Sequence, residues 1–253
     1  MPFGRRSRQT AESTNPDNLG YCAICMGEAT FVVEGPWLRD QYKCAVCHTI
    51  PRQRAVVEVL NAVRPNWRML SIHESSPSLC FFGEQCEGYS FSYFFENVPR
   101  GSANDGVRCE DLERLTFEDE SFDVFVTQDV LEHVFHPDRA LSEISRVLKW
   151  GGIHVFTTPK HPFLGKSYAR ATSAGDEIVH LHEPHYHGNP VSADGSLVTW
   201  EYGADFDDLA RRWSGYATST FVIRDRTRGI DGEHLEVFVT LKDPANSTPL
   251  VPD

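Results

Sequence analysis

The pattern of apolar and polar positions is most informative between Leu115 and Pro159. The run FDVFVT is short and mostly apolar, as expected for a strand buried on both faces. ALSEISRVLKW has apolar residues at helical spacing, and IHVFTTP forms the next apolar run. Gly151 and Gly152 lie between them, and we expect this pair to end the helix because glycine readily adopts the left-handed conformation. The stretch therefore predicts one βαβ unit.

Patterns on either side extend this α/β organisation. PRQRAVVEVLNAV predicts an amphipathic helix that ends before Pro65. Three strands are expected before Leu115, from RMLSIHE, from part of GEQCEGYSFSYFFENVP and from VRC. Towards the C-terminus, DFDDLARRW predicts a helix ended by Gly215, and the β runs YATSTFVI and HLEVFVTL follow it.

Composition narrows the classes of function. At 253 residues with 40% hydrophobic residues, the chain is long enough for one medium domain and a small module. The net charge of -12 argues against a nucleic-acid partner, because such binding draws much of its affinity from Lys and Arg. No apolar run approaches the roughly 20 residues of a membrane helix, and no signal core follows MPFGRRSRQT. We expect a soluble, cytoplasmic protein with no membrane partner.

Four of the seven cysteines form two close pairs, YCAIC and CAVCH, with the spacing C-x2-C-x18-C-x2-C. Two such turns complete the tetrahedral sulfur shell that zinc prefers, and four thiolates leave no open coordination position. The spacing predicts a structural zinc ion bound by Cys22, Cys25, Cys44 and Cys47. A redox dithiol or a catalytic zinc is the alternative. The module could act as a lid, a substrate wall or the contact of a homodimer.

The segments SFDVFVTQDVLEHV and HPDRALSEISRVLKWGGIHVFTTP carry a family resemblance. They resemble the fourth and fifth strands and the intervening helix of class I S-adenosylmethionine-dependent methyltransferases, a group with many small-molecule acceptors. The resemblance is strong over residues 109–159 and weaker over residues 68–97 and 205–241. It implies a Rossmann-like α/β fold with a mostly parallel sheet and an antiparallel last strand, S-adenosyl-L-methionine as cofactor and a small-molecule acceptor substrate.

These observations predict a division of the chain into five parts. Both ends are polar and poor in side chains that could pack, so we expect a disordered N-terminal tail and a flexible C-terminal tail. The predicted parts are a tail at 1–19, a zinc-binding module at 20–50, a linking helix at 51–64, a methyltransferase domain at 65–242 and a tail at 243–253.

The resemblance places a cofactor-binding loop after the first strand of the domain. The family normally carries a GxGxG loop there, whereas this chain has His73 to Ser78 and no glycine. A serine-rich turn must then bind the ligand through hydroxyls and amides. Glu74 is expected to accept from the methionine ammonium, while Ser75 and Ser76 donate to its carboxylate. A loop whose site has decayed is the alternative.

Further cofactor contacts are expected at the ends of the next strands. Ser92 or Tyr93 is the candidate for the ribose, although Tyr and Phe here could simply be core. Asp111 with Leu112 occupies the place where the family reads the adenine amino group, and a surface Asp in a turn is the alternative. Gln128, at the end of FDVFVTQ, is expected to lie along the cofactor.

The segment after Gln128 has two interpretations. Asp129 and Glu132 form D-x-x-E at an expected helix start, which is a capping box and needs no functional explanation. His133 could line the substrate side of the pocket or only pack in the first turn.

Histidines gather in the long stretch beyond Pro159, where His180, His182, His185 and His187 fall within eight residues. Long loops inside a compact domain are usually functional. A second metal site and a structural network are two interpretations. The third is acceptor binding, in which His185, His187 and His133 take a proton from a hydroxyl or hold a carboxylate, assisted by Tyr186.

The sequence therefore predicts a methyltransferase that methylates an oxygen of a small acceptor, either a carboxylate or a phenolic hydroxyl. One alternative is an RNA base methyltransferase, against which the acidic balance counts. Another is a zinc-binding interaction protein on a degenerate, non-catalytic core, which the missing glycine loop would explain.

Overall fold

The computed structural model describes residues 16–78, 81–175, 177–188 and 195–246. Two compact units divide the chain, and each is built from more than one segment. The smaller unit contains Met1–Arg54 and Arg224–Glu233, and the larger contains Ala55–Ile223 and His234–Asp253. This differs from the uninterrupted domain expected at 65–242, because a segment near the C-terminus returns to the smaller unit.

The smaller unit is built on an antiparallel sheet of β1 (Asn18–Cys22), β2 (Gly27–Val33) and β3 (Tyr42–Cys44), with the short helix α1 (Leu38–Gln41). β1 begins at Asn18, so the predicted tail at 1–19 is too long at its inner end; residues 1–15 lie outside the described part. The 3-10 helix η3 (Arg226–Arg228) joins this unit, because the Asn18 amide donates to the Arg226 carbonyl at 2.7 Å.

Arg54 connects the parts of the smaller unit and is fully buried. Its guanidinium donates to the carbonyls of Thr49, Tyr42 and Gly229, with 2.7 Å to Tyr42 and 2.6 Å to Gly229. The group also lies 4.8 Å from the centroid of the Phe31 ring. Five donors in a rigid fork let one arginine bind three backbone carbonyls from separate segments.

Helix α2 (Pro51–Val63) matches the predicted amphipathic helix; Val56, Val57 and Leu60 are buried, and Val63 on the same side is partly buried. The boundary between the two units falls within it, at Arg54 and Ala55. The 3-10 helix η1 (Trp67–Met69) follows in the larger unit.

The largest sheet has eight strands within the described residues, in the order β16-β17-β9-β8-β4-β5-β7-β6. Its strands in chain order are β4 (Ile72–Ser75), β5 (Tyr89–Tyr93), β6 (Ala103–Asn104), β7 (Val107–Cys109), β8 (Phe122–Gln128), β9 (Leu148–Thr157), β16 (Thr218–Phe221) and β17 (Val237–Leu241). β5, β4, β8 and β9 pair in parallel, whereas β17 is antiparallel to β9 and β16. This arrangement confirms the predicted Rossmann-like fold and the antiparallel strand pair.

The order of the strands reverses between β4 and β8. From β4 the chain moves outward through β5 and β7, and it then returns to place β8 and β9 on the other side of β4. Ser75 pairs with Thr127 in this register. In open α/β sheets, ligands bind outside the carboxyl ends of the strands at such a reversal.

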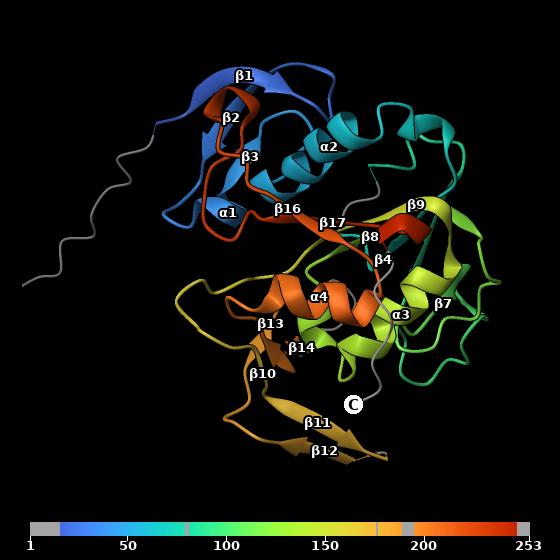
Figure 1. The fold of residues 1–253 in the computed structure, drawn as a ribbon. Helices are drawn as coiled ribbons and strands as arrows, with labels where there is room; N and C mark the ends of the chain where they lie inside the picture. Colours follow the sequence, from blue (N-terminus) through green and yellow to red (C-terminus); the bar gives the residue numbers. More distant parts are fainter. Residues whose placement is uncertain (1–15, 79–80, 176, 189–194, 247–253) are drawn as a thin grey trace, which may run out of the picture. The chain divides into compact units, whose positions relative to one another are not determined.

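Helices α3 (Pro137–Val147) and α4 (Phe206–Ser214) pack together and cover one face of this sheet (Figure 1). Their buried side chains join Phe125, Phe156 and Phe238 of the sheet in one hydrophobic cluster. Gly215 ends α4 in the left-handed conformation, as predicted.

The predicted role of Gly151 and Gly152 is wrong. Helix α3 already ends at Val147, and both glycines lie inside strand β9. Gly151 has a φ of +78°, and a Cβ at Gly152 would come within 2.8 Å of the Lys149 carbonyl oxygen. The pair therefore permits an irregular start to β9.

Short two-stranded ribbons follow β9. They are β10 (Tyr168–Ala169) with β15 (Trp200–Glu201), β11 (Ala171–Ala174) with β12 (Glu177–His180), and β13 (Tyr186–His187) with β14 (Ser196–Leu197). The β11–β12 ribbon projects away from the central sheet (Figure 1). The predicted C-terminal tail begins with the 3-10 helix η4 (Pro244–Asn246), and residues 247–253 lie outside the described part. Of the seven cysteines, Cys80 also lies outside the described part. Among the described residues, no helix combines the length and the apolar character needed to cross a membrane.

We expect Arg54→Lys to destabilise the smaller unit by about 2–4 kcal/mol, since an ammonium cannot reach three carbonyls and buried acceptors would lose their donors. Amide hydrogen exchange of β1 to β3 measures this effect. Arg114→Lys is the control, because Arg114 is exposed and its substitution should change exchange little. Unchanged protection of β1 to β3 in Arg54→Lys would contradict the role given to Arg54.

Candidate functional site

A buried polar network lies where the strand order reverses, at the carboxyl ends of β4 and β8. Glu74 is fully buried on β4, and its two oxygens accept from Gln128 Nε2 and Tyr89 Oη, each at 2.8 Å. Gln128 is 7% exposed, and its Oε1 has no hydrogen-bond partner among the described residues. A buried acceptor without a donor is costly, so this atom fits a ligand that donates a hydrogen bond.

The turn after β4 adopts a backbone conformation that glycine usually supplies. Ser76 has a φ of +54°, and its N–H donates to the Ser92 carbonyl at 2.8 Å. The Tyr93 hydroxyl donates to the Pro77 carbonyl on the same turn. The chain therefore makes a left-handed turn at the position of the family's glycine loop, although it lacks the glycine.

The loop starts later than expected, because His73, Glu74 and Ser75 all belong to β4. His73 is fully buried, and its ring nitrogens contact the hydroxyls of Ser90 and Ser92 at 2.9 and 3.0 Å. Burial lowers the pKa of His73 to about 3, so this imidazole is neutral at pH 7. The structure thus places Ser92 in the core with its hydroxyl bonded to His73, and not at the edge expected for the ribose.

Asp111 and Leu112 begin the loop 110–121 that follows β7. Leu112 is buried in the hydrophobic cluster, while Asp111 Oδ1 accepts from the Glu113 N–H at 2.9 Å. Asp111 Oδ2 lies 3.3 Å from Arg100 Nη1. The side chain of Asp111 is 26% exposed, so its carboxylate stays accessible to a ligand while the turn fixes its position.

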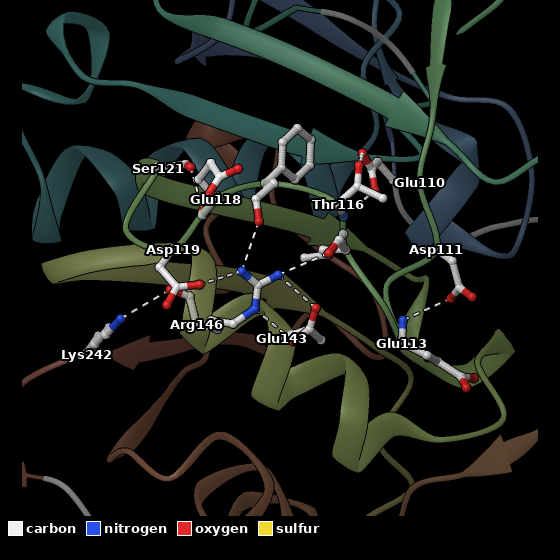
Figure 2. Close-up of polar contacts among 12 residues, drawn as sticks. Glu110, Asp111, Glu113, Thr116, Glu118, Asp119, Ser121, Glu143, Arg146 and Lys242 are labelled. Carbon is white, nitrogen blue, oxygen red and sulfur yellow. Dashed lines mark hydrogen bonds and ion pairs between the residues drawn. The ribbon is translucent and has the colours of Figure 1, made fainter. Parts of the chain in front are cut away.

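Arg146 on α3 holds this loop (Figure 2). Its guanidinium donates to the carbonyls of Leu115 and Phe117 at 3.0 and 2.9 Å. It also forms a two-point contact with Glu143 at 2.9 Å and an ion pair with Asp119 at 2.7 Å. Hydrogen bonds to Glu143 raise the pKa of Arg146 further, so it remains charged. The conformation of the loop that carries Asp111 therefore depends on helix α3.

The segment after β8 differs from the predicted capping box. Asp129 has a φ of +54°, and its carboxylate accepts from Thr157 Oγ1 at 2.8 Å. Glu132 lies in the 3-10 helix η2 (Leu131–His133), is 2% exposed, and accepts from Thr158 Oγ1 at 3.0 Å. Helix α3 starts only at Pro137. Both acids therefore bind the end of β9, and neither caps a helix.

Three of the proposed catalytic imidazoles come together beside Glu132. The ring centroids of His133 and His187 are 5.7 Å apart, and those of His185 and His187 are 4.7 Å apart. Burial lowers the pKa of both His133 and His187. His133 belongs to η2 and His187 to β13, which lie far apart in the sequence.

Other members of the histidine-rich stretch are placed elsewhere. His180 lies on the exposed strand β12, and the ring of His182 packs against Tyr168 at 4.8 Å. Tyr186 is 54% exposed and alternates along the chain with His185 and His187. The structure brings His133, His185 and His187 together and leaves Tyr186 on the surface.

The cysteines of the smaller unit form the predicted cluster. Sγ atoms of Cys22 and Cys47 lie 3.8 Å apart, and those of Cys25 and Cys44 lie 3.7 Å apart. All four sulfurs lie within 4.8 Å of one another, which fits a tetrahedral metal ion. The hydrogen bond with Cys22 lowers the pKa of Cys47, while burial raises the pKa of Cys25. Negative charge is thus favoured at Cys47, and a bound cation would be needed for all four thiols to ionise together.

Two residues of these sites were not identified from the sequence. Tyr89 was not selected, since only its place on the strand beside β4 lets its hydroxyl reach Glu74. Glu132 was interpreted as a helix cap because D-x-x-E has that local meaning. Its position four residues after the end of a buried strand was the available signal.

Comparison with known proteins agrees with this architecture. Residues 84–156 match the family model described as "Methyltransferase domain". No curated protein matches the chain.

Solved structures with a similar chain course include several methyltransferases. The S-adenosylmethionine-dependent methyltransferase from Mesorhizobium loti is 19% identical, covers 74% of this chain and 97% of its own, and has a TM-score of 0.48. CalS10, an amino pentose methyltransferase from Micromonospora echinaspora, is 14% identical over 77% of this chain and 92% of its own, with a TM-score of 0.48. At these values the likeness does not identify a substrate.

Residues 84–156 of the larger unit thus match a methyltransferase domain, and the strand order of that unit is that of a Rossmann-like fold. The same chain also carries a cluster of four cysteines in its smaller unit.

Replacing Arg146 by Lys should loosen the loop that presents Asp111, because an ammonium cannot bind two carbonyls and two carboxylates at once. We expect a loss of about 1–2 kcal/mol, which lowers the affinity for S-adenosylhomocysteine roughly tenfold in calorimetry. Arg139→Lys serves as the control, since Arg139 is exposed on the same helix. Equal affinities of the two variants would refute a role for Arg146 in shaping the cofactor site.

Proposed function

We propose that this protein transfers the methyl group of S-adenosylmethionine to an oxygen of a small-molecule acceptor, either a carboxylate or a phenolic hydroxyl. The observation that carries the proposal is the position of two polar clusters at the carboxyl edge of one sheet. Glu74 and Gln128 lie at the reversal of strand order, and the imidazoles of His133 and His187 lie beyond the ends of β8 and β9. One cluster suits the cofactor and the other suits the acceptor.

The cofactor would be held by groups that the fold has already oriented. Gln128 Oε1 is a buried acceptor for a donor of the ligand, and the left-handed backbone at Ser76 takes the conformation that glycine usually supplies in such a turn. Asp111 remains partly exposed on a fixed loop. When bound, S-adenosylmethionine supplies a methyl group that its sulfonium already activates, so the protein mainly aligns the acceptor with it.

The acceptor side requires a group that binds oxygen. His133 Nδ1 contacts the Leu197 carbonyl at 2.8 Å, so this nitrogen carries the proton and Nε2 presents a lone pair. The lowered pKa values of His133 and His187 keep both imidazoles neutral at pH 7, in the form that accepts a proton. Transfer of the proton of a hydroxyl acceptor to this cluster would leave the oxygen able to attack the methyl carbon, and S-adenosylhomocysteine would be the leaving group.

We further propose that the four cysteines bind zinc in a structural role. Four thiolates with a zinc ion carry a net charge of about -2, which a nearby cation would offset. Arg54 lies close enough that the thiolates of Cys22, Cys44 and Cys47 act to raise its pKa, against the lowering effect of burial. The closed shell leaves no position for a substrate.

Calorimetry with S-adenosylhomocysteine tests the proposed activity. We expect one ligand per chain, and we expect Gln128→Ala to weaken binding about tenfold because about 1.4 kcal/mol of hydrogen bonding is lost. Gln85→Ala should bind normally, since Gln85 precedes β5 and lies at the opposite edge of the sheet. Incubation with labelled cofactor and a panel of carboxylic acids and phenols then identifies the acceptor. No binding of cofactor or product at high protein concentration would favour the non-catalytic alternative.

Metal analysis should find about one zinc per chain with the cysteines reduced. Cys44→Ser should lose it and unfold the smaller unit, because metal binding supplies much of that unit's folding free energy. Cys86→Ser should keep its zinc, since Cys86 is a buried thiol near the Leu70 carbonyl of the larger unit. Less than about half an equivalent in the native protein would refute structural zinc.

A further inference from the structure

The larger unit contains a second group of metal-ligating side chains. One oxygen of Glu132, one nitrogen of His133 and one nitrogen of His187 all lie within 4.8 Å of one another. Glu132 and His133 are neighbours on η2, whereas His187 comes from β13. This group was not apparent from the histidine-rich stretch, because two of its three members lie outside it.

The tautomer of His133 suits metal binding. A carbonyl oxygen only accepts hydrogen bonds, so the 2.8 Å contact with the Leu197 carbonyl places the proton on His133 Nδ1. The lone pair is then on Nε2. Histidine ligands of metal ions typically donate their other ring N–H to a carbonyl or carboxylate, which fixes the ring.

Glu132 is held in a comparable way. It is 2% exposed, and one carboxylate oxygen accepts from Thr158 Oγ1 at 3.0 Å. Ligating carboxylates are commonly fixed by a hydrogen bond of this kind. A buried carboxylate next to two imidazoles is also a costly arrangement unless positive charge compensates it.

The backbone that carries these side chains is rigid. The Thr199 N–H and hydroxyl donate to the Glu132 carbonyl at 2.7 and 3.1 Å, and the Tyr202 hydroxyl donates to the Leu131 carbonyl at 2.8 Å. His187 pairs with Ser196 across the β13–β14 ribbon, and Leu197 of the same ribbon holds His133. The segments that carry the three ligands are thus hydrogen-bonded to the same stretch, residues 196–202. A metal site needs its ligands to be held in place in this way.

We propose that Glu132, His133 and His187 bind a divalent transition-metal ion. Two imidazole nitrogens and one carboxylate oxygen suit Mn²⁺, Fe²⁺, Co²⁺ or Zn²⁺ better than Mg²⁺ or Ca²⁺, which prefer oxygen ligands alone. Three protein ligands also leave coordination positions open, in contrast to the four cysteines of the smaller unit.

The site narrows the acceptor class, an extension that rests on the proposed methyl transfer. Open positions on such an ion suit an acceptor with two neighbouring oxygen atoms, such as a hydroxyl beside a carboxylate or a second hydroxyl. Asp129 contributes negative charge to the surroundings of both His133 and His187, so the cluster adjoins the end of β8. With the ion bound, the lone pairs of His133 and His187 are occupied, so in this arrangement the imidazoles orient the acceptor through the cation and do not accept its proton.

Titration with Mn²⁺ tests the site. The full-length protein is first dialysed to one zinc per chain, so that the cysteine site is filled, and free Mn²⁺ is followed by electron paramagnetic resonance. Manganese disfavours thiolates, and it therefore reports on the second site. We expect one Mn²⁺ bound per chain and at least a tenfold weaker affinity in His187→Ala, which is chosen because His187 is only half-buried on a short ribbon.

The matched control is His180→Ala, because His180 belongs to the same histidine-rich stretch but lies on exposed β12. Its Mn²⁺ affinity should equal that of the native protein. Absence of uptake by the native protein, or equal uptake by His187→Ala, would overturn the metal site. Binding of S-adenosylhomocysteine is measured on the same samples: if it fails while Mn²⁺ binds, the proposed methyl transfer is wrong and the metal site stands.

Discussion

The parallel pairing of β4, β8 and β9 organises the larger unit. Because the three strands run in the same direction, their carboxyl ends meet at one edge, where Ser75 pairs with Thr127 and Gln128 pairs with Thr157. Every polar group buried there must find a partner in the protein or in a ligand. Glu74, Gln128, Asp129 and Glu132 are all located by this requirement.

Four histidines of the larger unit form two pairs according to where they lie relative to that edge. His73 and His154 are inside the sheet, bonded to hydroxyls of neighbouring strands and packed among phenylalanine rings. Burial lowers the pKa of each to about 3, so both act as neutral core residues. His133 and His187 lie beyond the strand ends, where their nitrogens face other donors and acceptors.

Different interactions stabilise the two units. The larger has an extensive hydrophobic cluster between its sheet and helices. The smaller has three short strands, and one arginine binds carbonyls of its separate segments. The proposed zinc ion would add a second cross-link through the four cysteines. A small unit with little apolar interior commonly depends on such cross-links.

Several features of this protein are encoded in local patterns of its sequence. The βαβ unit, the helices over residues 51–63 and 206–214, the cysteine spacing and the fold class all follow from periodicity, short-range chemistry and the family resemblance. Which polar residues contact each other depends instead on how the strands and loops pack in three dimensions. The pattern D-x-x-E predicts a helix cap, but Asp129 and Glu132 instead accept hydrogen bonds from residues at the end of β9. Three further features depend on contacts between distant segments, which no local pattern records. They are the position of Gly151 and Gly152 inside β9, the hydrogen bond between His133 and the Leu197 carbonyl, and the inclusion of residues 224–233 in the smaller unit.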